Sequence, residues 1–182
     1  MSPALFLDRD GVINKNYGYV NKVEEFDFID GIFKLTQNAA AKNYKIVIIT
    51  NQAGIGRGYY SEEDFHILTK WMNLKFNENG SSIDRVYFSP YHPTAGIGKY
   101  LKDDISRKPN PGMILQAQSE LNINLQDSIL IGDKLTDIEA GIAAGVGLNI
   151  LFSSKENTLN TNLPCKKIDS LDQANKFLIF NS

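Results

Sequence analysis

Short apolar runs alternate with segments of helical periodicity along most of the chain. Five runs are rich in β-branched and aromatic side chains and are predicted strands: Ala4–Leu7, Lys45–Thr50, Arg85–Phe88, Ser128–Ile131 and Leu148–Phe152. Strands separated by helices are typical of a parallel sheet with crossover helices. The pattern therefore predicts an α/β fold with a central, mostly parallel sheet flanked by helices.

Three segments carry the marks of helices. The clearest starts at Ser61, a favourable N-cap followed by three acidic residues that suit the first turn. Its apolar residues recur at helical spacing and are predicted to be buried: Phe65, Leu68, Met72 and Phe76. A second helix is predicted to begin at Asn110-Pro111, because proline suits the first helical position, and Ile114, Ala117 and Leu121 then fall on one face. Ser170 to Phe180 is predicted to form a closing C-terminal helix.

Two long stretches, Gly11–Asp30 and Ser89–Asn110, show neither the helical nor the strand pattern. Long loops in a compact domain usually serve function, so both are candidates for the walls of a site. The asparagine-rich segment Ser153–Leu163 is instead predicted to be a surface loop.

Length and composition limit the classes of function. The chain has 182 residues, which predicts a single domain over residues 1–182, and 42% of them are apolar, enough for a packed core. A net charge of -2 without a basic run argues against nucleic-acid and membrane partners. The lone Cys165 cannot form an internal disulfide, and no signal peptide or membrane-spanning run is recognisable, so a cytoplasmic protein is expected.

Carboxylates follow two predicted strands, and a hydroxyl lies at the end of a third. Asp8 and Asp10 come directly after the first strand, Thr50 ends the second, and Asp133 follows the fourth. Ligands of open parallel sheets bind beyond the carboxyl ends of the strands, so these groups are expected at one rim. An isolated Asp-x-Asp beside glycine is usually only a turn, but three strand ends with matching chemistry favour a site for Mg²⁺, which prefers oxygen ligands.

These residues form a pattern that resembles the haloacid dehalogenase (HAD) superfamily, whose members are mostly phosphatases on a Rossmann-like fold. All four superfamily motifs occur in order: Phe6–Ile13, Ile49–Asn51, Lys108 before a helix, and Ile131–Asp137. Each motif alone is weak, whereas the ordered set is specific. No segment has room for a large cap domain, so the resemblance implies an open site whose loops choose the substrate.

The resemblance assigns catalytic roles residue by residue. Asp8 is expected to be the nucleophile that forms an aspartyl-phosphate, and Asp10 to protonate the leaving alcohol and then activate water. Thr50 and Lys108 are expected to stabilise the transferring phosphoryl group. The Mg²⁺ ligands are expected to be Asp8, Asp133 and the backbone carbonyl of Asp10. Two simpler interpretations remain: Lys108 could be a solvated surface lysine, and Asp137, expected to give only indirect support, could merely favour a helix start.

Within the superfamily, the closest resemblance is to the D-glycero-D-manno-heptose 1,7-bisphosphate phosphatases, relatives of the histidinol-phosphate phosphatases. It rests on additional segments: Asn16–Val20, Phe28–Gly31, Thr50–Gly58, Arg107–Met113 and Gly132–Asp137. The implied substrate-binding residues are Asn16, Tyr17, Gly18, Tyr19, Thr50, Asn51, Gln52, Ala53, Arg107, Lys108 and Lys134. Arg107 is the better candidate for gripping the phosphate that is not cleaved, and Arg57 is a weaker one.

One departure from these relatives concerns a zinc site. Many of them hold the loop before Arg-Lys-Pro with a structural zinc bound by Cys-x-His and Cys-x-Cys pairs, where this chain has Ser89–Tyr91 and Asp104–Ser106. Without thiols no structural zinc is expected, and a substitute site at His92 with Asp103 or Asp104 is a minor alternative. The loop is instead expected to be packed down by apolar side chains: Tyr91, Ile97, Tyr100 and Leu101.

The sequence thus predicts a Mg²⁺-dependent phosphatase acting on the C7 phosphate of a heptose bisphosphate, in the supply of nucleotide-activated heptose for lipopolysaccharide or capsule. Its partner would be a small phosphorylated sugar, and the chain would act as a monomer. One alternative changes the substrate to histidinol phosphate or another small phosphate ester. Another is a phosphosugar-binding protein without turnover, which the complete set of catalytic residues disfavours. The preferred anomer stays open.

Overall fold

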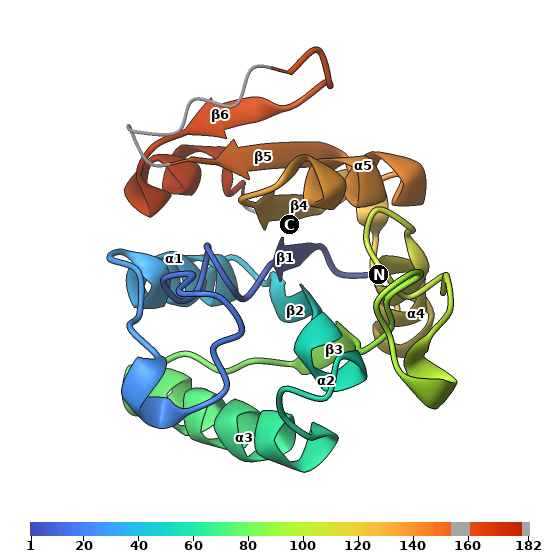
Figure 1. The fold of residues 1–182 in the computed structure, drawn as a ribbon. Coiled ribbons are helices and arrows are strands. Elements are labelled where there is room, and N and C mark those ends of the chain that lie inside the picture. The colour runs from blue at the N-terminus through green and yellow to red at the C-terminus, as the bar shows by residue number, and fades with distance from the viewer. Residues whose placement is uncertain (154–160, 180–182) are drawn as a thin grey trace.

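The computed structural model describes residues 1–153 and 161–179 and contains a six-stranded sheet (Figure 1). The strands are β1 (Ala4–Leu7), β2 (Lys45–Asn51), β3 (Arg85–Ser89), β4 (Ile129–Gly132), β5 (Leu148–Phe152) and β6 (Lys166–Ile168). They pair only in parallel, in the order β3-β2-β1-β4-β5-β6. The five predicted strands are confirmed, with end positions that differ by at most one residue.

Strand β6 was not predicted. Two of its three residues are Lys166 and Lys167, and both are exposed, so this stretch lacks the apolar run that marks the inner strands. It pairs only with β5, at the edge of the sheet, where lysines discourage pairing with another chain.

The helices are α1 (Ile32–Ala41), α2 (Ala53–Gly56), α3 (Glu62–Glu78), α4 (Gly112–Leu121) and α5 (Leu135–Ala144). Shorter 3₁₀ turns are η1 (Val23–Glu25), η2 (Gly98–Tyr100), η3 (Leu125–Asp127) and η4 (Leu171–Phe177). The predicted buried residues of α3 are confirmed, and Ser61 caps it in a reciprocal capping box with Asp64. Helix α4 begins one residue later than predicted, with Pro111 as its N-cap.

The closing helix predicted for Ser170 to Phe180 is wrong in type and length. The structure has a 3₁₀ helix, η4, in its place, and Phe180 lies outside the described residues. The buried Leu171 and Ala174 and the partly buried Phe177 recur every third residue, which matches the three residues per turn of a 3₁₀ helix. Most of the predicted Asn-rich loop, residues 154–160, also lies outside the described residues.

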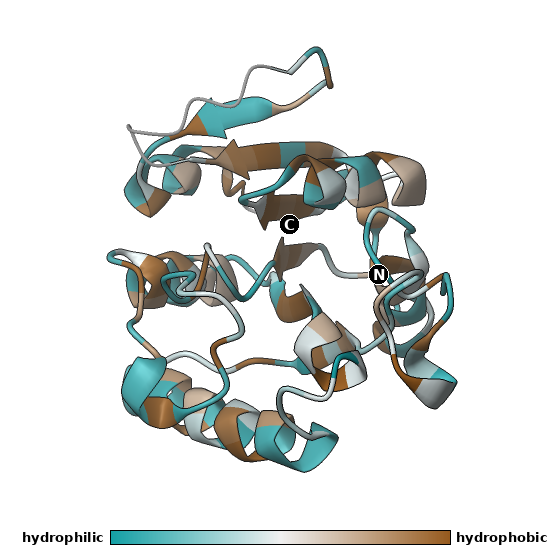
Figure 2. Cartoon of the chain, viewed as in Figure 1, coloured by the Kyte–Doolittle hydropathy of each residue, from teal (hydrophilic) through white to brown (hydrophobic). Residues whose placement is uncertain are grey.

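Helices cover both faces of the sheet. Alternate side chains of the inner strands pack with α1, α3 and η4 in one apolar cluster and with α4 and α5 in a second. Figure 2 shows the apolar colouring of the central strands between these layers. The α/β prediction is therefore confirmed. None of the helices in the described residues is long and apolar enough to cross a membrane.

The strand order places a natural crevice beside β1. The chain proceeds outward from β1 to β2 and β3 on one side, then returns to β4 on the other, so β1 and β4 flank the switch point at which ligands bind in such sheets. Between β1 and α1 the structure contains only η1, and between β2 and β3 only α2 and α3. The prediction that no large cap covers the site is confirmed.

Candidate active site

Asp8 and Lys108 meet at the carboxyl end of β1. Asp8 continues the strand, with its N–H donating to the Ile131 carbonyl at 3.0 Å. Lys108 Nζ donates to Asp8 Oδ1 at 2.8 Å and to the Ile49 carbonyl at 2.9 Å, and it lies 2.7 Å from Asp137 Oδ1. All three charged side chains are buried, so Lys108 is not the solvated surface lysine of the simpler interpretation.

Burial and charge act in opposite directions on this cluster. Burial alone would lower the pKa of Lys108, but Asp137 and Asp8 outweigh it and raise that pKa, so Lys108 is a cation. Burial raises the pKa of Asp8 to about 6, against the lowering influence of Lys108. Two buried carboxylates beside one ammonium group leave excess negative charge, which a metal ion would offset.

Asp133 brings a third carboxylate to the cluster. Gly11 makes this approach possible, because it adopts a φ of +102° and a Cβ at that position would lie 2.1 Å from Asp133 Oδ2. Carboxylate oxygens of Asp8, Asp133 and Asp137 all lie within 4.8 Å of one another. Burial, with the charge of Asp8, raises the pKa of Asp133 to about 7.

These residues fit a Mg²⁺ ion. Asp133 Oδ1 is buried without a hydrogen-bond partner, and such a buried oxygen is normally paired, so it suits a metal ligand. Asp137 is less available, because its oxygens already bind Lys108 Nζ and accept from the backbone N–H of Lys134. Asp8 and Asp133 are therefore the better side-chain ligands, and the prediction of Mg²⁺ as cofactor agrees with this all-oxygen donor set.

Asp10 faces the same crevice from the loop after β1 and is held by three neighbours. Arg9 Nη2 donates to both of its carboxylate oxygens, at 2.9 and 2.8 Å, and Asn14 Nδ2 donates to Oδ1 at 3.0 Å. Gln52 Nε2 donates to Oδ2 at 3.1 Å. Arg9 is itself buried and also donates to the Val20 carbonyl at 2.7 Å, so it anchors the carboxylate to the loop.

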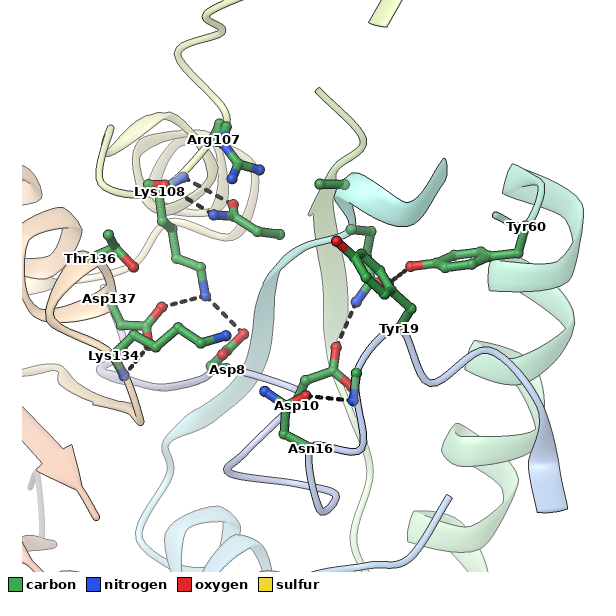
Figure 3. A pocket seen from close by; sticks show the side chains of 14 residues that line it. Asp8, Asp10, Asn16, Tyr19, Tyr60, Arg107, Lys108, Lys134, Thr136 and Asp137 are labelled. Atoms are coloured by element: carbon green, nitrogen blue, oxygen red, sulfur yellow. Dashed lines mark hydrogen bonds and ion pairs between the residues drawn. The ribbon is translucent and has the colours of Figure 1, made fainter. Parts of the chain in front are cut away.

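The cavity above these groups has a volume of about 390 Å³ (Figure 3). Its lining includes these predicted residues: Asp8, Asp10, Asn16, Gly18, Tyr19, Asn51, Gln52, Ala53, Arg107, Lys108 and Lys134. Tyr17 is outside it, 59% exposed with its hydroxyl donating to Asp27. Thr50 is buried and is not among the lining residues, and its Oγ1 accepts from Gln52 Nε2 at 2.8 Å.

Sequence reasoning missed two residues that line the cavity and underrated a third. Tyr60 and Thr136 were not singled out, and Asp137 was expected to give only indirect support. Asp137 and Thr136 belong to the first turn of α5, so their proximity to a motif was a usable signal. Tyr60 reaches the site from the segment before α3, and no motif marks it.

Two basic side chains besides Lys108 line the cavity. Arg107 and Lys134 both line it, and Arg107 is tied to the preceding loop because Nη1 donates to the Tyr91 carbonyl at 3.0 Å. Arg57 is not among the lining residues and instead hydrogen-bonds the Tyr19 hydroxyl and packs near the ring of Tyr59.

The loop over residues 89–106 is held by hydrogen bonds at the positions for which the sequence resemblance implied zinc ligands in related proteins. Ser106 Oγ donates to Asp104 Oδ1 at 2.6 Å and lies 3.0 Å from Ser89 Oγ. The Nδ1 atom of His92 accepts from the N–H of Ala95 at 3.0 Å. The absence of zinc stays a prediction.

The expected apolar packing of this loop is only half right. Tyr91 and Tyr100 are partly buried, with ring centroids 6.2 Å apart, but Ile97 and Leu101 are exposed. Polar contacts hold the loop where apolar packing was expected.

Comparisons with a family model and with named proteins find similar sequences. Residues 105–153 match the family model described as HAD-hyrolase-like. A Burkholderia mallei protein named D-glycero-alpha-D-manno-heptose-1,7-bisphosphate 7-phosphatase is 54% identical over 84% of this chain and 81% of its own. A Vibrio cholerae protein named for the beta anomer is 48% identical over 82% and 80% of the two chains.

Solved structures show the same fold. A HAD-like phosphatase from Mesorhizobium loti has a TM-score of 0.87 at 32% identity, covering 97% of this chain and 84% of its own. A D,D-heptose 1,7-bisphosphate phosphatase from B. bronchiseptica, complexed with magnesium and phosphate, has a TM-score of 0.84 at 23% identity and covers 96% of both chains. With its four motifs assembled at one crevice and more than half of the aligned residues identical to the B. mallei enzyme, the chain belongs to the D-glycero-D-manno-heptose 1,7-bisphosphate 7-phosphatase family of HAD-like hydrolases.

Proposed function

We propose that this protein hydrolyses the C7 phosphate of a D-glycero-D-manno-heptose 1,7-bisphosphate and so supplies the heptose 1-phosphate needed for nucleotide activation. The 54% identity to the B. mallei 7-phosphatase carries this choice of substrate. The buried pair of Asp8 and Lys108, opening into a cavity with two further basic residues, supports the phosphatase chemistry.

Asp8 attacks the phosphorus and forms an aspartyl-phosphate while the sugar leaves. Its carboxylate must be ionised to attack, and Lys108 at 2.8 Å favours that form. Lys108 also offsets the charge that develops on the phosphoryl oxygens. Asp8, Asp133 and the backbone carbonyl of Asp10 would hold the Mg²⁺, which supplies further positive charge against the phosphate.

Asp10 transfers a proton in each of the two steps. As the acid it protonates the leaving C7 oxygen, and as the base it then takes a proton from the water that hydrolyses the aspartyl-phosphate. Thr50 supports the phosphoryl group, because its Oγ1 accepts from Gln52 and its own proton is left to donate to a phosphoryl oxygen. Arg107 and Lys134 bind the C1 phosphate that is not cleaved, with the flat guanidinium of Arg107 suited to a two-point contact.

A substrate panel tests the proposal. Initial rates of phosphate release are measured with the α and β heptose 1,7-bisphosphates, histidinol phosphate and a simple sugar monophosphate, with Mg²⁺ and with EDTA. We expect Mg²⁺-dependent turnover with kcat/KM highest for one heptose bisphosphate, and the comparison of the two anomers decides between the substrates in the names of the B. mallei and V. cholerae relatives. A heptose bisphosphate no better than the simple ester would refute the proposed substrate.

The variant Asp8→Asn separates catalysis from mere binding. It removes the nucleophile, so turnover should fall to background while the fold survives, as checked by circular dichroism. Turnover retained in Asp8→Asn would contradict the covalent mechanism.

A further inference from the structure

Tyr60 is joined to the catalytic groups by hydrogen bonds that pass through Gln52. Its ring is 8% exposed, and its hydroxyl donates to Gln52 Oε1 at 2.5 Å. On the other side of the same amide, Nε2 donates to Asp10 Oδ2 at 3.1 Å and to Thr50 Oγ1 at 2.8 Å. Both polar atoms of the Gln52 amide therefore have side-chain partners inside the protein.

The direction of these bonds matters because a glutamine amide can turn over and exchange its donor for its acceptor. In the observed orientation, Nε2 supports an oxygen of Asp10, and the Thr50 proton is left free for the phosphoryl group. In the reversed orientation, Oε1 would take the Thr50 proton and would face the Asp10 carboxylate without a hydrogen between them. Only one orientation of Gln52 serves the reaction.

Tyr60 stabilises that orientation: the ionised Asp10 carboxylate only accepts and so faces Nε2, which leaves Oε1 to accept from the Tyr60 hydroxyl. Burial raises the pKa of Tyr60 to about 12, so its phenol keeps its proton at neutral pH. Its ring is fixed by packing with Ile55 and Phe65 in a small apolar cluster. Gly54 admits the ring, because a Cβ there would lie 2.2 Å from Tyr60 Cε1. Figure 3 shows the Tyr60 hydroxyl pointing into the cavity, where the labelled Asp10 also lies.

We propose that Tyr60 is a positioning residue that fixes the amide of Gln52 and thereby orients the Asp10 carboxyl group and the Thr50 hydroxyl for phosphoryl transfer. The proposal rests on the function proposed above, in which Asp10 exchanges protons and Thr50 supports the phosphoryl group. It gives Gln52 a role within the protein in addition to the substrate contact expected from the resemblance.

The first test is the leaving-group dependence of Tyr60→Phe. Loss of one oriented hydrogen bond should lower kcat/KM, which reports on the phosphorylation of Asp8, by about fivefold for the heptose bisphosphate, whose alkoxide needs a proton from Asp10. For an aryl phosphate, whose phenolate leaves without help, the loss should be less than about twofold. A merely structural role would lower both rates equally. The matched control is Tyr87→Phe, which removes the hydroxyl of another buried tyrosine, bonded to Glu120 at 2.8 Å, and should leave both rates unchanged.

A double-mutant cycle shows whether Tyr60 acts through Gln52. Gln52→Met removes the amide at similar volume, and adding Tyr60→Phe to it should lower kcat/KM no further, because the path to Asp10 is already broken. Equal losses on the two esters, or additive effects of the two substitutions, would overturn the inference while wild-type turnover keeps the proposed function intact. A wild-type protein inactive on every ester would overturn both.

Discussion

Lys108 is the residue on which the buried charges of the site depend. Its ammonium group lies within 2.8 Å of both Asp8 and Asp137, and all three side chains are nearly inaccessible to water. Removing the cation leaves two buried carboxylates without compensation, and breaking a buried pair this way typically costs about 3–5 kcal/mol. The positions of these charges therefore bear on stability as well as on catalysis.

We predict that Lys108→Met lowers the free energy of unfolding of the metal-free protein at pH 8 by about 3 kcal/mol, because methionine fills similar space without the charge. Urea unfolding in EDTA measures this. The control is Lys75→Met, which removes the half-exposed partner of Glu78 at 2.8 Å and should change stability little. Equal stabilities of Lys108→Met and wild type would contradict the importance of the cluster.

The variants Asp10→Asn and Asp8→Asn should lose different steps of the reaction. Asp10→Asn keeps the nucleophile, but it loses proton transfer, which is worth about 10²–10⁴-fold for an alkoxide leaving group. With an aryl phosphate, phosphorylation of Asp8 should proceed and hydrolysis of the intermediate should limit the rate. Rapid-quench measurements should then show a burst of phenol and trapped phosphoenzyme. A uniform loss on alkyl and aryl esters without a burst would be inconsistent with acid-base catalysis by Asp10.

Sequence reasoning located the groups at strand ends but not how they are supported. Asp8, Asp10 and Asp133 follow strands whose apolar runs are easy to recognise, so their convergence could be predicted. Tyr60 reaches the site only because Gly54 leaves space for its ring, and such a contact depends on packing between segments that no local pattern encodes.

At the scale of elements, the start of α3 is fixed by a local signal, the capping box of Ser61 and Asp64. Ser61 Oγ accepts from the N–H of Asp64 at 3.1 Å, and the Asp64 carboxylate accepts from the Ser61 N–H at 2.8 Å. Ser61→Ala should lower the free energy of unfolding by about 1 kcal/mol, because a backbone donor loses its acceptor. Ser119→Ala, at an exposed site within α4, is the control and should change stability little. Chemical denaturation compares the two, and equal effects would refute the capping role.

The elements that the sequence predicted well are those with strong local signals. Helix α3 has a cap and a periodic apolar face, and the inner strands have unbroken apolar runs. The edge strand β6 has two exposed lysines among three residues, and η4, predicted as a closing C-terminal helix, has its apolar residues at every third position. Both errors occur where tertiary position, more than local propensity, decides the structure.

At the scale of the whole molecule, the sheet brings negative charge together at one crevice, where Lys108 offsets part of it. Asp8, Asp133 and Asp137 converge there from β1, β4 and the start of α5, so a metal ion held by them would link distant parts of the chain. The single domain over residues 1–182 and the monomeric state stay predictions, which sedimentation velocity can test.

The last prediction concerns pH and Mg²⁺ together. Burial raises the pKa of Asp8 to about 6 and that of Asp133 to about 7 from the ordinary 3.8, so the folded metal-free protein binds protons more tightly than the unfolded chain. The resulting stabilisation is complete below about pH 4 and is lost progressively as the pH rises through the two raised pKa values to above 7.

Metal-free protein should therefore melt at a lower temperature at pH 8 than at pH 5. Mg²⁺ should raise the melting temperature more at pH 8, because its ligands must be deprotonated. Scanning calorimetry with EDTA or excess Mg²⁺ measures both effects. In Asp133→Asn the side chain at position 133 does not titrate. This variant should show a weaker pH dependence of the melting temperature and should lose most of the rise in melting temperature on adding Mg²⁺. A metal-free protein that becomes more stable from pH 5 to pH 8, or a Mg²⁺ response independent of pH, would show that these carboxylates are not the groups that hold the ion.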